Sequence, residues 1–325
     1  MERREFLKES GLGIAALSLM GRGLVAAAQG QVARVALVRT RDRAAGVGAV
    51  MKLLEVASPK GRNVLIKPNL FLATTKPNGT HNDTLRQVVL EMRARGASRI
   101  TVGGRSGPSS TKTIMELKRL PALAQELGFE LVSFEDLPAS GWVHFDPRAN
   151  HWQKGFDVAR PVVEAEYLVW VCCLKAHTEA AFAMSLKHGV GALHRDLMAE
   201  LHGADETDMR AMIAEINQAF RPQVIVMDGV EVFVDGGPAR GTLAVAGVVV
   251  GGTDRIAVDA VGLAILKHLG STEEIMSKRV FEQEQIRRAA ELGLGVGKPA
   301  EIDIVTGDAE SREYADAIRR ILARG

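Results

Sequence analysis

The sequence predicts an α/β protein with a mostly parallel sheet and helices on both of its faces. Short apolar segments typical of strands alternate along the chain with longer amphipathic segments typical of helices, which indicates a parallel sheet. The run from Tyr167 to Leu174 is continuously apolar, as in a strand that is buried on both faces. A chain of 325 residues suits one large domain or two lobes. We therefore expect one α/β domain over residues 31–325, with lobes at 31–160 and 161–325 as the alternative.

Each expected element rests on a patterned stretch of sequence. Strands are expected where apolar and β-branched residues run together, at residues 32–38, 63–67, 99–103, 129–134, 167–174, 224–228, 243–251 and 301–306. Helices are expected at residues 44–57, 83–96, 111–127, 207–220, 272–292 and 311–324, and at a further segment that Asp254 caps. Pro121 breaks the third of these helices. Residues 137–161 are an irregular connection with room for a short hairpin, and residues 202–206 are expected to form a polar loop.

The first thirty residues have the three parts of an export signal. Arg3 and Arg4 give a basic start, residues 11–20 are largely apolar, and the alanines at 26–28 form a small-residue cleavage site. The paired arginines, followed by Phe-Leu-Lys, resemble the twin-arginine (Tat) signal, which the Tat export machinery reads as an address. We expect residues 1–30 to be this signal peptide and the protein to be periplasmic or secreted. An uncleaved signal would tether it to the membrane, and a frayed amphipathic helix is the alternative reading.

Composition argues against several classes of partner and cofactor. A net charge of +2 gives no reason to expect nucleic acid or an anionic membrane as partner. Beyond the signal, no apolar run approaches the ~20 residues of a spanning helix. Cys172 and Cys173 are adjacent, so their side chains point to opposite faces of a strand and do not bridge. Without any CxxC, we expect no cysteine-ligated iron–sulfur cluster; the two thiols are interpreted as core residues, with a redox role as the alternative.

Polar residues follow five of the expected strands where each strand ends. They are Lys67 and Asn69, Gly103 to Arg105, Lys175 with His177, Asp228, and Asp254. In open α/β sheets, ligands bind in the crevice outside the carboxyl ends of the strands. The pattern therefore predicts a ligand site at one edge of the sheet.

Lys175 and His177 are the predicted catalytic pair. A buried lysine with a lowered pKa and a histidine near neutrality can exchange protons with a substrate; a solvated surface loop is the alternative. The residues expected to bind an anionic substrate are Lys67, Asn69, His81, Arg105, Thr178 and Lys187. Lys187 and the neighbouring His188 also fit an exposed helix face.

Three aspartates are candidates for holding a divalent metal, which is the only cofactor that the sequence suggests. Asp228, Asp254 and Asp259 carry carboxylates, the ligands that hard cations prefer. Asp228 and Asp254 fit equally a role in orienting the lysines, and Asp259 fits a structural hydrogen bond inside an apolar helix face. The loop at 103–110 has glycines that suit an anion, but it matches neither GxGxxG nor the P-loop pattern.

Taken together, these segments resemble a family known as domain of unknown function 362 (DUF362). The matching segments are VLIKPNL at 64–70, Thr80-His81, LKAHT at 174–178, SLK at 185–187 with Gly189, VMDG at 226–229, GGP at 236–238 with Gly241, and GTD at 252–254 with AVDA at 257–260. Members often carry an export signal or a ferredoxin-like cysteine cluster; this chain has the signal pattern and lacks the cysteines. Asn82 replaces a proline common in the family. Gly104-Arg105 replace a usual acidic residue, which weakens any metal site that would use it.

The residues and the resemblance lead to one main hypothesis and two alternatives. The main hypothesis is an exported enzyme that acts on a small anionic substrate by Lys/His acid–base chemistry, with or without a metal. The alternatives are a non-catalytic binding protein for a small anion or cofactor, and a redox accessory protein.

Overall fold

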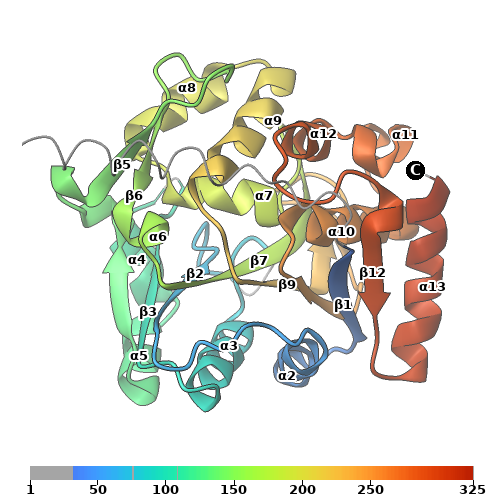
Figure 1. Ribbon diagram of the computed structural model, residues 1–325, viewed down its shortest axis with the longest axis horizontal. Coiled ribbons are helices and arrows are strands. Elements are labelled where there is room, and N and C mark those ends of the chain that lie inside the picture. The colour runs from blue at the N-terminus through green and yellow to red at the C-terminus, as the bar shows by residue number, and fades with distance from the viewer. Residues whose placement is uncertain (1–31, 75–76, 108, 325) are drawn as a thin grey trace, which may run out of the picture. The chain divides into compact units, whose positions relative to one another are not determined.

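A ten-stranded mixed sheet organises the computed structural model, which describes residues 32–74, 77–107 and 109–324 (Figure 1). The strands follow each other along the sheet in the order β12-β1-β11-β9-β7-β2-β3-β4, with β10 paired to β9 and β8 to β7. Their bounds are β1 Ala33–Arg39, β2 Asn63–Pro68, β3 Arg99–Gly104, β4 Glu130–Ser133, β7 Tyr167–His177, β8 Ala181–Phe182, β9 Val224–Phe233, β10 Leu243–Ala244, β11 Val248–Gly252 and β12 Ile302–Val305. The α/β fold predicted from the sequence is confirmed.

One strand on this path runs against its neighbours. Strands β4, β3, β2, β7 and β9 are mutually parallel, whereas β11 pairs antiparallel with both β9 and β1. The carboxyl ends of β2, β3 and β7 therefore lie at one edge of the sheet, and the carboxyl end of β11 lies at the opposite edge. This difference decides which of the predicted residues meet.

Helices cover both faces of the sheet (Figure 1). One face carries α2 Arg43–Leu53, α3 Asn82–Ala94, α4 Thr111–Leu117 and α5 Leu120–Leu127. The other carries α9 Glu206–Glu215, α10 Arg255–Leu269, α12 Glu284–Glu291 and α13 Ala309–Arg324. The shorter helices are α6 Arg160–Val163, α7 Ser185–His188, α8 Met198–Gly203 and α11 Glu273–Ser277, and β5 Trp142–Phe145 with β6 Phe156–Ala159 forms a separate hairpin.

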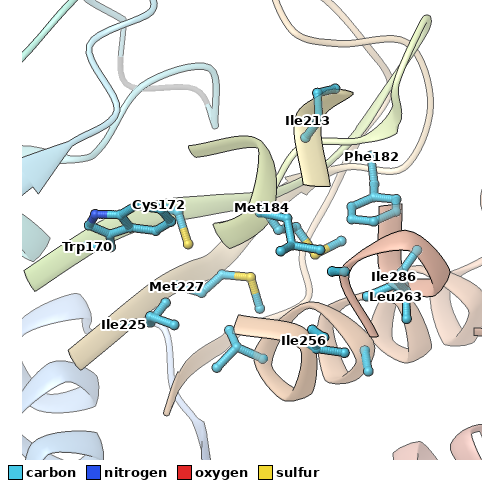
Figure 2. Packing of buried hydrophobic residues seen from close by; sticks show 14 of the residues in the cluster. Trp170, Cys172, Phe182, Met184, Ile213, Ile225, Met227, Ile256, Leu263 and Ile286 are labelled. Atoms are coloured by element: carbon cyan, nitrogen blue, oxygen red, sulfur yellow. The ribbon is translucent and has the colours of Figure 1, made fainter. Parts of the chain in front are cut away.

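The central strand β7 is buried along its whole length, as the apolar run predicts. Trp170, Cys172 and Leu174 pack into the core on the α10 face, whereas Val169 and Val171 pack into the core on the α2–α3 face. Figure 2 shows the first of these cores, in which side chains of β7 and β9 meet those of α10. Burying both faces of β7 fixes its position, and with it the position of the polar residues at its end.

Short polar side chains set where several helices begin. Asp42, Asp205 and Asp254 each accept a hydrogen bond from the backbone N–H three residues on, at the starts of α2, α9 and α10. Thr272 does the same for α11. Each such cap stabilises a helix by about 1 kcal/mol.

Three expected elements differ from the structure. The strand expected at 243–251 is two strands, because Gly247 turns the chain with a φ of +57°. The helix expected at 272–292 is divided into α11 and α12, because the chain is extended at Lys278 and Arg279 and then forms a 3-10 turn at Val280–Glu282. The Gln283 amide donates hydrogen bonds to the carbonyls of Glu274 and Ile275. The polar loop expected at 202–206 overlaps the end of α8.

The predicted export signal at residues 1–30 lies outside the described residues. Residues from Val32 onward form one compact unit, and the sheet takes strands from both sides of residue 160. Within the described part of the chain, no helix combines the length and the apolar character needed to cross a bilayer.

Candidate functional site

A cavity of about 140 Å³ opens where β2, β3 and β7 end. Its lining contains four basic side chains, Lys67, Arg105, Lys175 and Lys187, together with the histidines His177, His188 and His202. Among the described residues that line it there is no aspartate or glutamate. Apolar side chains, including Phe71, Met184 and Met198, complete the wall. The cavity is therefore strongly electropositive.

Lys67 reaches the cavity from the carboxyl end of β2 and is 2% exposed. Its Nζ donates a hydrogen bond of 2.9 Å to the carbonyl of His188, and His188 Nε2 donates one of 2.8 Å to the carbonyl of Lys67. This reciprocal pair fastens β2 to α7. Burial, together with the charge of Arg105, lowers the pKa of Lys67 to about 7.

Lys175 lies near the end of β7, next to a register shift between Cys173 and Lys175. Its Nζ donates a hydrogen bond of 2.9 Å to the carbonyl of Pro77 in the loop after β2. Burial lowers the pKa of Lys175. The amine is held in place by an uncharged acceptor, and it forms no salt bridge with a carboxylate of the described residues.

Lys187 lies on α7, whose position depends on Asp259. Both oxygens of that buried carboxylate accept hydrogen bonds, from the backbone N–H groups of Ser185 and Leu186 and from Ser185 Oγ. Burial raises the pKa of Asp259 to about 7. Burial and the charge of Lys175 lower the pKa of Lys187 to about 8, against the opposing effect of Glu179.

Arg105 follows β3 and donates to backbone carbonyls of the segment after α7. Its Nε bonds the carbonyl of Leu193 at 3.0 Å, and its Nη2 bonds that of Val190 at 3.3 Å. Burial and the nearby Arg195 lower the pKa of Arg105 to about 10. The guanidinium therefore keeps its charge at neutral pH.

His177 lines the cavity, but its expected pKa near neutrality is wrong. Its Nδ1 accepts hydrogen bonds from the backbone N–H groups of Glu179 and Ala180, so the proton of the neutral ring is on Nε2. Burial, followed by the charges of Lys187 and Lys175, lowers the pKa of His177 to about 2. The ring is a neutral hydrogen-bond donor at physiological pH, whereas the pKa values of the Lys67 and Lys187 amines, about 7 and about 8, lie near neutrality.

Of the other residues expected to bind substrate, one lines the cavity and two do not. Asn69 is part of the wall. Thr178 is exposed and donates its hydroxyl to the carbonyl of Gly237 at 3.1 Å. His81 caps α3 and faces a separate small pocket that it shares with Asp228 and Arg43.

The structure does not bring the three candidate metal ligands together. Asp228 lies within β9, which continues to Phe233, and its carboxylate accepts hydrogen bonds from Arg43 and Thr84 at 2.8 and 2.7 Å. Asp254 follows β11 and caps α10, at the opposite edge of the sheet because β11 is antiparallel. Within the described ranges, no group of three or more His, Cys, Asp or Glu residues is arranged to hold a metal ion.

The sequence alone did not single out several residues of the wall. His202 is on α8, where a loop was expected, and Cys172 and Cys173 were interpreted as core. Gly191 passes so close to Lys67 that a Cβ there would lie 2.7 Å from Lys67 Nζ. In the sequence, the sign of this close approach is Gly191 itself, the second glycine after the Lys187-His188 pair.

Comparison with known proteins agrees with the sequence pattern. The family model described as domain of unknown function (DUF362) matches residues 64–264. The chain belongs to the DUF362 family. The matched region of this DUF362 chain includes all four cationic residues of the cavity wall.

Two proteins illustrate what this DUF362 chain is similar to. Thylakoid-associated protein sll1697 of Synechocystis is 24% identical over 288 residues, which cover 83% of this chain and 86% of that protein. Among solved structures, the lactate racemase apoprotein of Thermoanaerobacterium thermosaccharolyticum aligns over 89% of this chain and 86% of its own, with 13% identity and a TM-score of 0.46.

Proposed function

We propose that this DUF362 protein is an enzyme that binds a small anionic substrate in the cavity and transfers protons with lysine amines. The observation that carries the proposal is a wall with four cationic side chains and, among its described residues, no carboxylate. An unpaired buried charge destabilises a protein by several kcal/mol. An anion in the cavity would offset that effect for several side chains at once.

The size of the cavity limits the substrate. Sites for drug-sized ligands measure roughly 300–1,000 Å³, whereas this cavity measures about 140 Å³. A short carboxylate or a phosphate-sized anion fits these dimensions and leaves the apolar wall at Phe71 and Met184 to contact carbon atoms.

The geometry favours a division of roles that differs from the sequence prediction. Arg105 and Lys175 would hold the negative charge of the substrate: backbone carbonyls fix both groups, and Arg105, with a pKa of about 10, keeps its charge at neutral pH. Lys67 and Lys187 would exchange protons, because their pKa values of about 7 and about 8 lie near physiological pH. His177 would donate a hydrogen bond from Nε2 without changing its charge.

Isothermal titration calorimetry with acetate, pyruvate, phosphate and sulfate tests the anion site. We expect at least one of them to bind at one site per chain, and Lys175→Met to weaken that binding by at least about tenfold, or ~1.4 kcal/mol. Lys112→Met is the matched control, because Lys112 is exposed on α4 and does not line the cavity. The proposal is contradicted if none of the four binds, or if both variants bind like the wild type.

A non-catalytic binding protein for a small anion or cofactor is the second candidate. It is favoured by the hydrogen bonds that hold the Lys67 and Lys175 amines to backbone carbonyls, because binding alone also needs side chains that are fixed in position. Native mass spectrometry of protein purified from its own host would identify a retained ligand. With that ligand in hand, unchanged affinity and lost turnover in His177→Gln would favour the enzyme, whereas tight retention without turnover in the wild type would favour the binder.

We also propose that the Tat machinery exports the protein, on the basis of the pattern at residues 1–30. Replacing Arg3 and Arg4 by lysine should leave the protein in the cytoplasmic fraction of its host. Export of this double variant at the wild-type level would contradict the proposal.

A further inference from the structure

The three lysines of the cavity wall differ in what their amines contact. Lys67 and Lys175 each donate to a backbone carbonyl, of His188 and Pro77. Lys187 makes no hydrogen bond or ion pair with any residue that the structure describes, although it lies in the same wall. Its amine is therefore the one that can approach a ligand without first breaking a bond to the protein.

The groups around Lys187 suit a carbonyl compound. Lys175 lies close enough to act on its charge, and His177 presents a neutral ring whose free Nε2 carries a proton. A neutral N–H donor can polarise a carbonyl oxygen without transferring a full charge to it. Arg105 and Lys175, which also line the cavity, would hold a carboxylate on the same small molecule.

We propose that Lys187 is the nucleophile of the site and forms a Schiff base with a small 2-oxo acid. This inference rests on the proposed function, since it places the anionic substrate in the same cavity. The requirement for a neutral amine is met in part at physiological pH, because burial and Lys175 lower the pKa of Lys187 to about 8. A lysine that is desolvated beside a second cation is the arrangement that activates amines for this chemistry.

The proposed step balances without an oxidant or reductant. The Lys187 nitrogen forms a bond to the carbonyl carbon, and the carbonyl oxygen takes up a proton to give a carbinolamine. The second proton of the nitrogen passes to the new hydroxyl group, the C–O bond breaks, and one water leaves as the C=N bond forms. Once its nitrogen is protonated, the imine withdraws electrons from C3 of the 2-oxo acid, which favours loss of a proton from that carbon.

Reductive trapping tests this step on the full chain. The protein is incubated with glyoxylate, pyruvate or 2-oxoglutarate and sodium cyanoborohydride, and the adduct is located by peptide mass spectrometry. We expect one adduct per chain, on Lys187, and its loss in Lys187→Arg, which keeps the positive charge. Lys112→Arg, on the exposed face of α4, should give the wild-type yield.

A second measurement separates the two proposals. Calorimetric binding of propanoate, which has no ketone or aldehyde to attack, reports the anion site without covalent chemistry, and pyruvate is titrated for comparison. If these anions bind and no 2-oxo acid gives an adduct on Lys187, the Schiff base is overturned and the anion site stands. If no anion binds, both proposals are overturned. Equal adduct yield in Lys187→Arg would place the reaction elsewhere and overturn the assignment of Lys187.

Discussion

Replacing Lys67 by methionine removes a buried positive charge and keeps a side chain of similar length. Lys67 is 2% exposed, and its amine bonds only a carbonyl, with Arg105 as a cationic neighbour. Its pKa falls from 10.5 to about 7, so the folded protein holds this proton less tightly than the unfolded chain does. A shift of this size corresponds to roughly 5 kcal/mol of destabilisation while the amine is charged in both states.

The pH dependence follows from the direction of that shift. Below about pH 7 the Lys67 amine is protonated in both the folded and the unfolded state, so the wild type is destabilised by the full amount. Above about pH 7 the amine loses its proton in the folded state first, so the free energy of unfolding of the wild type rises. We expect Lys67→Met to be more stable than the wild type at pH 6. That advantage should shrink by about 2–3 kcal/mol between pH 6 and pH 9. The lost hydrogen bond to His188, about 1–3 kcal/mol, reduces the advantage at both values of pH.

Equilibrium urea unfolding of the wild type and Lys67→Met at pH 6, 7.5 and 9 measures the difference between their free energies of unfolding. Titrating groups that the two proteins share cancel in this difference. Lys112→Met, at an exposed site, should differ from the wild type by the same amount at every pH. A difference for Lys67→Met that stays constant, or grows with pH, would refute the assignment of a charged, destabilising amine to this cavity.

Further predictions concern the close contacts and the proton chemistry of the site. Gly191→Ala should weaken anion binding by at least about tenfold, because the new methyl would lie 2.7 Å from Lys67 Nζ. If calorimetry shows that this variant binds the anion with wild-type affinity, the Lys67 amine is not where we place it. Gly262→Ala should lower the free energy of unfolding by about 1–3 kcal/mol, because its Cβ would overlap Met184 Sδ. Gly203→Ala is the control, because the space around Gly203 is open. Equal urea midpoints for the two variants would contradict this packing. Asp259→Ala should destabilise the fold by about 3 kcal/mol or more, because it leaves the N–H groups of Ser185 and Leu186 without their acceptor, and an unchanged thermal midpoint would argue against this role. Acylation of the Lys187 amine by an amine-reactive ester, followed by peptide mass spectrometry, should become faster as the pH rises through about 8 and the amine loses its proton, and a rate that stays flat over this range would contradict that pKa.

The sequence predicted those parts of the site that depend on neighbouring parallel strands. The apolar run of β7 identifies a doubly buried strand. Lys67 and Lys175 lie near the carboxyl ends of β2 and β7, Arg105 directly follows β3, and these three strands are parallel in the structure. Their meeting at one edge therefore follows from the order of elements along the chain. Lys187 was predicted because it closes a short segment directly after β7.

Other parts of the site depend on facts that no local pattern contains. Asp254 follows a strand as clearly as Lys67 does, but β11 is antiparallel, and strand direction is decided by its pairing with distant β1 and β9. The pKa of His177 depends on burial and on charges from α7, α8 and α9, which come together only in the folded chain. His202 reaches the wall because residues 198–203 are helical, where polar composition favoured a loop.

Anomalous diffraction from crystals soaked in sodium selenate tests the anion cavity most directly. Selenate is a small dianion that contains no carbonyl, so its binding depends on the cationic wall alone. We predict a selenium peak inside the cavity, within hydrogen-bond reach of the side chains of Arg105, Lys175 or Lys187. Selenium peaks at surface lysines with none in the cavity would contradict an anion site at this edge of the sheet.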